Sequence, residues 1–196
     1  MPKKRRPIAI AGAGGIVKDA HLPAYRKAGF EVKVIFDLDI TKAERVANQF
    51  QIPVVANELA EFVEVAQKHD CVFDLALPAK AILEVLSGLP DGSGVLIQKP
   101  MGETLDQARK ILQTCHQQEM TAGINFQLRH APYIQTAVEL VDRGEIGELH
   151  DIDIKMCVYT PWHLWEFLYE LPRVEILYHS IHYIILTWYV TFGGTR

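Results

Sequence analysis

Short apolar runs alternate with helical segments over the first two thirds of this chain, and this order most restricts the folds open to it. Six runs have the length of strands, at residues 8–11, 32–36, 54–55, 71–75, 94–97 and 121–124. They are almost continuously apolar, as expected for strands that are covered on both faces. Strands that alternate with helices predict βαβ units, and the sequence therefore predicts an α/β fold with a parallel sheet.

Helix start and stop residues support this order. Thr41 with Glu44 forms a capping-box pattern that predicts a helix start, and Thr104 with Gln107 predicts another. Gly29 predicts the end of the helix that follows the first strand. The predicted helices thus fill the intervals between the predicted strands.

The pattern changes after about residue 126. A helix is predicted over residues 132–141, and residues 150–159 then alternate between polar and apolar side chains. A period of two with one polar face is typical of a strand in an antiparallel sheet. The sequence therefore predicts two domains, over residues 1–125 and 126–196.

Composition excludes several classes of protein. The net charge of −4 gives no support for a nucleic-acid surface. The apolar stretch at residues 176–192 contains His179 and His182 and is too short for a membrane span. Three widely spaced cysteines form neither a disulfide framework nor a metal knuckle, so a cytoplasmic, reducing setting is favoured.

A glycine turn lies directly between the first strand and the first helix, as Gly12-Ala13-Gly14-Gly15. Gly12 would allow the tight turn, and Gly14 would allow a dinucleotide pyrophosphate to approach the backbone at a helix N-terminus. The third glycine of the usual pattern is replaced by Val17. A plain structural turn is the alternative.

Asp37 ends the second predicted strand. A carboxylate there can accept hydrogen bonds from an adenosine ribose and would repel a 2′-phosphate, so NAD is favoured over NADP. The alternative is a favourable charge at the start of the next helix, a role that Asp39 can also take.

Lys99 follows the buried strand at residues 94–97, within Gln98-Lys99-Pro100. Burying an ammonium is costly unless it is paired, and open α/β sheets bind ligands at this end of their strands. The position predicts an amine beside a bound ligand. The alternative is a lysine that reaches water.

Glu175, His179 and His182 have spacings of four and three, which place them on one face of a helix. This face predicts an acid/base pair, a metal site or satisfied core histidines. The aromatic loop at residues 161–165, which contains Trp162, is interpreted either as a wall of a substrate pocket or as a hydrophobic lid.

The motifs, taken in order, resemble the Gfo/Idh/MocA family, the glucose–fructose oxidoreductase and inositol dehydrogenase group. The matching segments are residues 11–16, 21–23, 37, 77–78, 98–100, 125 with 129, 144–147 and 179–182. The resemblance implies a Rossmann-type, doubly wound domain and then an α+β domain on an open antiparallel sheet. It also implies NAD(P)-dependent hydride transfer on a small-molecule substrate, a sugar, cyclitol or related hydroxyl compound. A homo-oligomer would form through that sheet if it is complete.

The resemblance implies a role for each matching residue. Lys99 and His182 would be catalytic, while His179, Arg129 and Trp162 would bind substrate. The cofactor would be held by Gly12, Gly14, Gly15, Ile16, Asp37, Pro78, Gln98, Lys99 and Asn125. Gln98 stands where the family usually has glutamate, and Ile185 stands where it often has aspartate.

Only one strand is predicted for the second domain, and one strand cannot form a sheet. We therefore expect a shortened gene product or a fragment with an incomplete second domain. The leading hypothesis is an oxidoreductase of this family. The alternatives are a nucleotide-binding module without turnover, acting as a sensor or vestigial product, and a metal-dependent enzyme that uses Glu175, His179 and His182.

Overall fold

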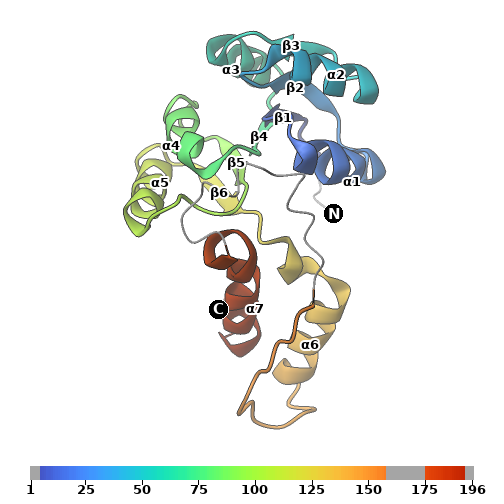
Figure 1. The fold of residues 1–196 in the computed structure, drawn as a ribbon, viewed down its shortest axis with the longest axis vertical. Coiled ribbons are helices and arrows are strands. Elements are labelled where there is room, and N and C mark those ends of the chain that lie inside the picture. The colour runs from blue at the N-terminus through green and yellow to red at the C-terminus, as the bar shows by residue number, and fades with distance from the viewer. Residues whose placement is uncertain (1–4, 158–174, 193–196) are drawn as a thin grey trace. The chain divides into compact units, whose positions relative to one another are not determined.

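A computed structural model describes residues 5–157 and 175–192 of the chain. The chain divides into two compact units, residues 1–125 and residues 126–196. The first unit contains the parallel sheet (Figure 1).

Six parallel strands form one sheet in the order β3-β2-β1-β4-β5-β6. The strands are β1 (Ile8–Ala11), β2 (Val32–Phe36), β3 (Val54–Ala56), β4 (Val72–Leu75), β5 (Gly94–Ile97) and β6 (Thr121–Ile124). The order reverses next to β1, so this is the doubly wound Rossmann arrangement. The predicted α/β fold is confirmed.

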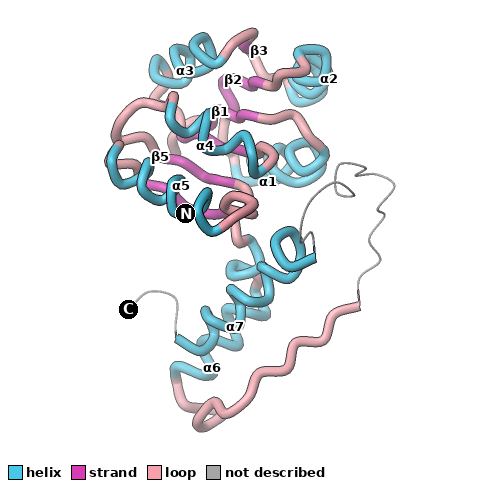
Figure 2. The backbone as a smooth tube through the Cα atoms, turned by 60° about the vertical axis from the view of Figure 1, so that its left-hand side comes forward, coloured by secondary structure: helices cyan, strands magenta, loops and turns pink. Residues whose placement is uncertain are grey.

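Helices cover both faces of this sheet (Figure 2). They are η1 (Val17–His21), α1 (Leu22–Ala28), α2 (Ile40–Phe50), α3 (Leu59–Lys68), α4 (Ala79–Ser87) and α5 (Leu105–Gln117). Alternate residues of β1 enter two different cores: Ile10 lies in one cluster and Ala9 in the other. The alternation explains why the strands are apolar on both faces.

The capping boxes were predicted with unequal success. Thr104 caps α5 as predicted, since its Oγ1 accepts a hydrogen bond from the Gln107 amide at 3.2 Å. The cap of α2 is Asp39 and not Thr41, because the Asp39 carboxylate accepts from the Lys42 amide at 3.1 Å. The helix therefore begins at Ile40, and Thr41 lies inside its first turn.

The described part of the second unit contains η2 (Gln127–His130), α6 (Pro132–Asp142), η5 (Glu175–Ser180) and α7 (Ile181–Phe192). The predicted strand at residues 150–159 is not formed over residues 150–157, which have no regular secondary structure. A strand needs a neighbour to pair with, and no strand lies in the described part of this unit. Residues 158 and 159 lie outside the described residues.

In the part of the chain that the structure describes, no helix has the length and apolar character needed to cross a membrane. Cys71 and Cys115 are buried, Cys157 is exposed, and all three are free thiols. Burial raises the pKa of the Cys71 thiol to about 11. The buried thiols are therefore packing groups and not nucleophiles.

Candidate functional site

The glycine turn follows β1 at the carboxyl end of the sheet. Gly12 has a φ of +104°, and a Cβ built there would lie 2.4 Å from the Ala76 carbonyl oxygen. Only glycine fits this close approach of two backbones. A Cβ at Gly14 would meet no atom within 4 Å, so the space in front of this residue is open.

The turn leads into a helical stretch at residues 15–21. Gly14 carbonyl oxygen accepts hydrogen bonds from the amides of Val17 and Lys18, both at 3.1 Å. The first amides of a helix have no acceptor within the helix, so Gly15 and Ile16 present N–H groups at this end. Such a terminus favours an anion.

Asp37 is held against the glycine turn. Its Oδ2 accepts a hydrogen bond from the Ala13 amide at 2.7 Å, and its Oδ1 accepts one from the Asp39 amide at 2.9 Å. Each carboxylate oxygen can accept a second hydrogen bond. Asp37 therefore braces the turn and keeps capacity for ribose hydroxyls, while the alternative role at the start of the next helix is taken by Asp39.

Lys99 lies where the sequence places it, just after β5. The backbone amide of Gln98 donates to the Leu75 carbonyl at 2.9 Å. The side-chain Oε1 of Gln98 accepts a hydrogen bond from the Lys99 amide at 3.1 Å. The peptide bond between Lys99 and Pro100 is cis. Burial lowers the pKa of the half-buried Lys99 ammonium below its usual value. A lowered pKa brings the amine nearer to the range of proton-transfer chemistry.

Two further candidate residues, Asn125 and Pro78, lie directly beside elements of the first unit. Asn125 follows β6, and its amide donates to the Ile97 carbonyl at 2.8 Å. Pro78 is exposed and is the residue immediately before α4. Gly12 and Asp37 thus follow the adjacent strands β1 and β2, and Lys99 and Asn125 follow the adjacent strands β5 and β6, all at the carboxyl edge of one sheet.

One group of buried polar residues was not predicted as a site. Asp74, in the centre of β4, is 1% exposed, and its Oδ2 lies 2.7 Å from His21 Nδ1. Tyr25 also donates to this oxygen, at 2.9 Å. The signal in the sequence is an aspartate inside an otherwise apolar strand, but its partner lies 53 residues away.

The residues of the first unit fit a dinucleotide. Gly14 faces open space where a pyrophosphate needs room, helix amides face the same turn, and Asp37 holds acceptor oxygens at the end of the adjacent strand. Each feature matches one part of the ligand: phosphates at the helix terminus and ribose at the acid.

The candidate residues of the second unit lie in three separate pairs of side chains. His179 Nδ1 lies 3.1 Å from Glu175 Oε2, and the side-chain hydrogen bonds from His179 and Ser180 lower the pKa of Glu175. The His182 ring meets the Phe126 ring edge-to-face, with centroids 6.3 Å apart. The Arg129 guanidinium lies 5.8 Å from the Tyr189 ring centroid, a cation–π distance. Trp162 lies outside the described residues.

The hypothesis of a metal-dependent enzyme requires a set of metal ligands, and the described residues contain none. Within residues 5–157 and 175–192, no group of three or more histidine, cysteine, aspartate or glutamate side chains is placed to hold a metal ion. The segment at Glu175–Ser180 is a π-helix and not an α-helix, which changes the spacing assumed for a common face. Glu175 contacts His179, while His182 packs on Phe126.

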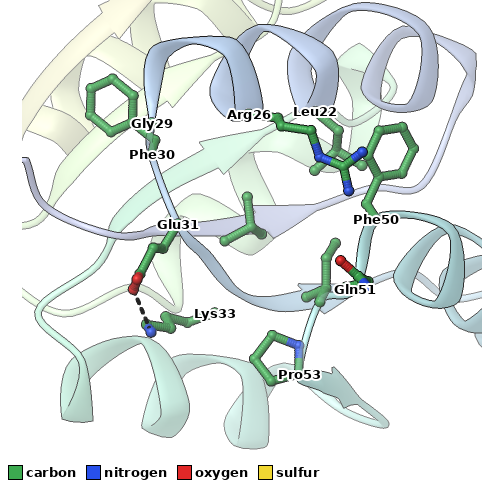
Figure 3. A pocket seen from close by; sticks show the side chains of 11 residues that line it. Leu22, Arg26, Gly29, Phe30, Glu31, Lys33, Phe50, Gln51 and Pro53 are labelled. Atoms are coloured by element: carbon green, nitrogen blue, oxygen red, sulfur yellow. Dashed lines mark ion pairs between the residues drawn. The ribbon is translucent and has the colours of Figure 1, made fainter.

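A surface depression of about 510 Å³ lies at the amino ends of β2 and β3, and Figure 3 shows the side chains that line it. It is lined by Arg26, whose guanidinium lies 5.5 Å from the Phe50 ring centroid, and by the ion pair of Lys33 with Glu31 at 2.5 Å. Ligands of doubly wound folds bind at the carboxyl ends of the strands. The depression lies at the other end and does not belong to the candidate site.

The parallel sheet and the glycine turn after β1 are those of a Rossmann fold. Residues 6–126 match the family model for the Gfo/Idh/MocA oxidoreductase family with an NAD-binding Rossmann fold. The chain belongs to this family. The resemblance seen in the sequence motifs is thereby confirmed.

The curated relatives that this chain matches are covered over only part of their own length. An uncharacterized protein of Saccharomyces cerevisiae is 28% identical over 141 residues, which are 69% of this chain and 40% of that protein. The D-xylose 1-dehydrogenase [NADP(+)] of Haloarcula marismortui is 26% identical over 144 residues, which are 72% of this chain and 40% of that enzyme. The matched region thus spans about 40% of the length of these two relatives.

Solved structures share the fold. An oxidoreductase from Agrobacterium radiobacter, in complex with NAD+, L-tartaric acid and magnesium, has a TM-score of 0.75 and 18% identity. The similarity covers 95% of this chain and 55% of that one. At this identity the similarity supports the fold alone.

Proposed function

We propose that the chain is an NAD(P)-dependent oxidoreductase that transfers a hydride between a nicotinamide cofactor and a sugar, cyclitol or related hydroxyl compound. One observation carries the proposal: the open glycine turn, the acid at the end of the adjacent strand and a half-buried lysine share the carboxyl edge of one sheet. Family membership supports the same assignment, as does the named activity of a sugar dehydrogenase among the relatives.

The proposed roles follow from the chemistry of each side chain. The cofactor, when bound, supplies the hydride acceptor or donor. Lys99 orients the substrate hydroxyl and stabilises negative charge as it develops on that oxygen. His182 accepts the hydroxyl proton, and His179 and Arg129 bind substrate. Lys99 belongs to the first unit and His182 to the second, so their joint role rests on the order of the family motifs.

Asp37 supports a preference for NAD within this proposal. Its carboxylate stands at the ribose position, and the next residue is the apolar Leu38, which is 94% exposed. A 2′-phosphate would meet a negative charge there, without an arginine beside it to compensate. The expected order of affinity is NADH above NADPH.

The Asp37→Asn variant tests this preference. The single oxygen of asparagine can keep the hydrogen bond from the Ala13 amide, while the bond from the Asp39 amide and the negative charge are lost. Loss of the fold's support weakens both cofactors alike, and loss of the charge relieves NADPH alone, so the ratio of NADPH to NADH affinity is expected to rise at least roughly tenfold, or about 1.4 kcal/mol. Fluorescence titration with both cofactors measures the ratio. Asp39→Asn is the matched control and should leave the ratio unchanged. An unchanged ratio in Asp37→Asn contradicts the role of the charge.

Turnover separates the oxidoreductase from its main alternative, a nucleotide-binding module without catalysis. The full chain is incubated with NAD+ or NADP+ and a panel of sugars, polyols and cyclitols, and formation of the reduced cofactor is followed by absorbance. The proposal expects turnover with at least one compound. Cofactor binding without turnover across the panel supports the alternative.

A further inference from the structure

A network of hydrogen-bonded polar side chains lies in the first unit, near the carboxyl ends of its strands. It begins at Asp74 on β4, continues to His21 at the end of η1 and ends at Asn125 after β6. Asp74 and His21 are 1% and 7% exposed, so water cannot substitute for these contacts. All three residues belong to the first unit.

The contacts fix which atoms donate. An ionised aspartate can only accept hydrogen bonds, so His21 Nδ1, at 2.7 Å from Asp74 Oδ2, must carry a proton. In the neutral ring, Nε2 is then an acceptor, and Asn125 Nδ2 lies 3.3 Å from it. With a neutral ring, donation runs from Asn125 through His21 to Asp74.

Tyr25 is a second donor to Asp74. Its hydroxyl donates to the same Oδ2 at 2.9 Å, and burial together with the Asp74 charge raises the pKa of the Tyr25 phenol well above its usual value. The phenol stays protonated and remains a donor. Tyr25 and Asp74 are the titratable groups that contact the His21 ring from α1 and β4.

This arrangement is an unfavourable way to build a stable core. Asp74 Oδ1 is buried and has no hydrogen-bond partner among the described residues. A buried carboxylate that is only half satisfied usually stabilises less than a well-packed apolar side chain would. Polar groups kept at such a cost point to a role other than stability.

Asn125 is the member of this network that can contact a ligand. It is half-buried, and its amide donates to the Ile97 carbonyl at the end of β5, directly before Gln98 and Lys99. The side-chain carboxamide has one acceptor and two N–H donors, and a rotation of 180° exchanges the acceptor for a donor. Holding Nδ2 on His21 leaves Oδ1 as the acceptor offered to a ligand.

We propose that Asp74 and His21 are positioning residues that fix the carboxamide of Asn125 in one orientation, so that its Oδ1 accepts a hydrogen bond from the nicotinamide half of the cofactor. The inference rests on the proposed cofactor binding. Asp74 selects the Nδ1–H tautomer of His21, and this tautomer selects the orientation of Asn125. Neither residue touches the ligand.

Three variants of the full chain test the coupling by NADH titration: Asp74→Asn, Asn125→Ala and the double variant. An asparagine at position 74 can donate as well as accept, so it no longer selects the tautomer. Asp74→Asn and Asn125→Ala should each weaken NADH binding roughly 3- to 10-fold, the range of one hydrogen bond. The double variant should bind no more weakly than Asn125→Ala alone.

Tyr25→Phe is the matched control, because it removes a donor to Asp74 and leaves the contact between Asp74 and His21. It is expected to lower stability and leave NADH affinity unchanged. Additive losses in the double variant, or unchanged affinity in Asp74→Asn, would overturn the inference. Wild-type protein that binds no NADH would overturn the proposed function as well, and the inference with it.

Nitrogen-15 NMR of the histidine rings in the free wild-type chain gives a second readout that needs no destabilised variant. The His21 signals, assigned by their loss in His21→Gln, should show a protonated Nδ1 and an unprotonated Nε2 at pH 7.5. The Nε2–H tautomer, or a doubly protonated ring, would overturn the inference even if Asp74→Asn fails to fold.

Discussion

Replacing Gly12 with alanine is expected to lower the free energy of unfolding by about 2–5 kcal/mol. The new Cβ would lie 2.4 Å from the Ala76 carbonyl oxygen, on a residue whose φ is +104°. Neither backbone can yield easily, because Gly12 donates to the Phe36 carbonyl at 2.7 Å and the Ala76 amide donates to Ala11 at 2.9 Å. Denaturant unfolding measures the loss.

Gly14→Ala is the matched variant. Because the space at Gly14 is open, this substitution is expected to change cofactor binding without changing the stability of the fold. A Cβ there meets nothing within 4 Å, so stability should change by less than about 0.5 kcal/mol. The methyl group would occupy the space proposed for the pyrophosphate, and NADH affinity should fall at least roughly tenfold. Gly123→Ala, which also adds a Cβ with nothing within 4 Å, should change neither property. Full NADH affinity in Gly14→Ala would contradict the proposed phosphate position.

Replacing Lys99 with methionine is expected to reduce kcat by roughly 10²- to 10⁴-fold, the usual range for a lost proton-transfer or charge-stabilising group. Methionine retains most of the packing of the lysine stem, so the variant tests the ammonium and not the fold. The affinity for NADH should stay within about threefold. Lys110→Met, at an exposed position of α5, is the control.

The pH dependence of kcat tests whether Lys99 acts in its charged form. Burial lowers the pKa of this ammonium, so the folded protein loses the charge at a lower pH than an exposed lysine does. If the charged form is the working one, kcat falls as the pH rises through that lowered pKa. Lys99→Met should lack this decrease at high pH. Equal activity of Lys99→Met and wild type would show that the assigned role is wrong.

The first unit could be predicted closely from the sequence because its signals are local. The strands and glycine turns lie where apolar runs and Gly12 or Gly29 place them. The position of Asp37 and Lys99 at the same edge of the sheet also follows from the parallel topology. The cap of α2 was less clear, since Asp39 and Thr41 are both good caps. In the structure the cap is Asp39, whose own amide donates to the Asp37 carboxylate at 2.9 Å.

Features that depend on distant partners could not be predicted in the same way. The alternation at residues 150–157 indicates a strand but not a neighbour for it. Asp74 was included in an apolar strand, because nothing near it in sequence reveals His21 or Tyr25 as its partners. The spacing of Glu175, His179 and His182 assumed an α-helix, and the π-helical turn at Glu175–Ser180 alters it.

Calorimetric titration of the full chain with NADH tests most directly the claim that the carboxyl edge of this sheet is a dinucleotide site. We expect saturable binding to the wild type, at least roughly tenfold weaker binding to Gly14→Ala and unchanged binding to Gly123→Ala. No binding at millimolar NADH, or equal binding by the wild type and Gly14→Ala, would contradict it.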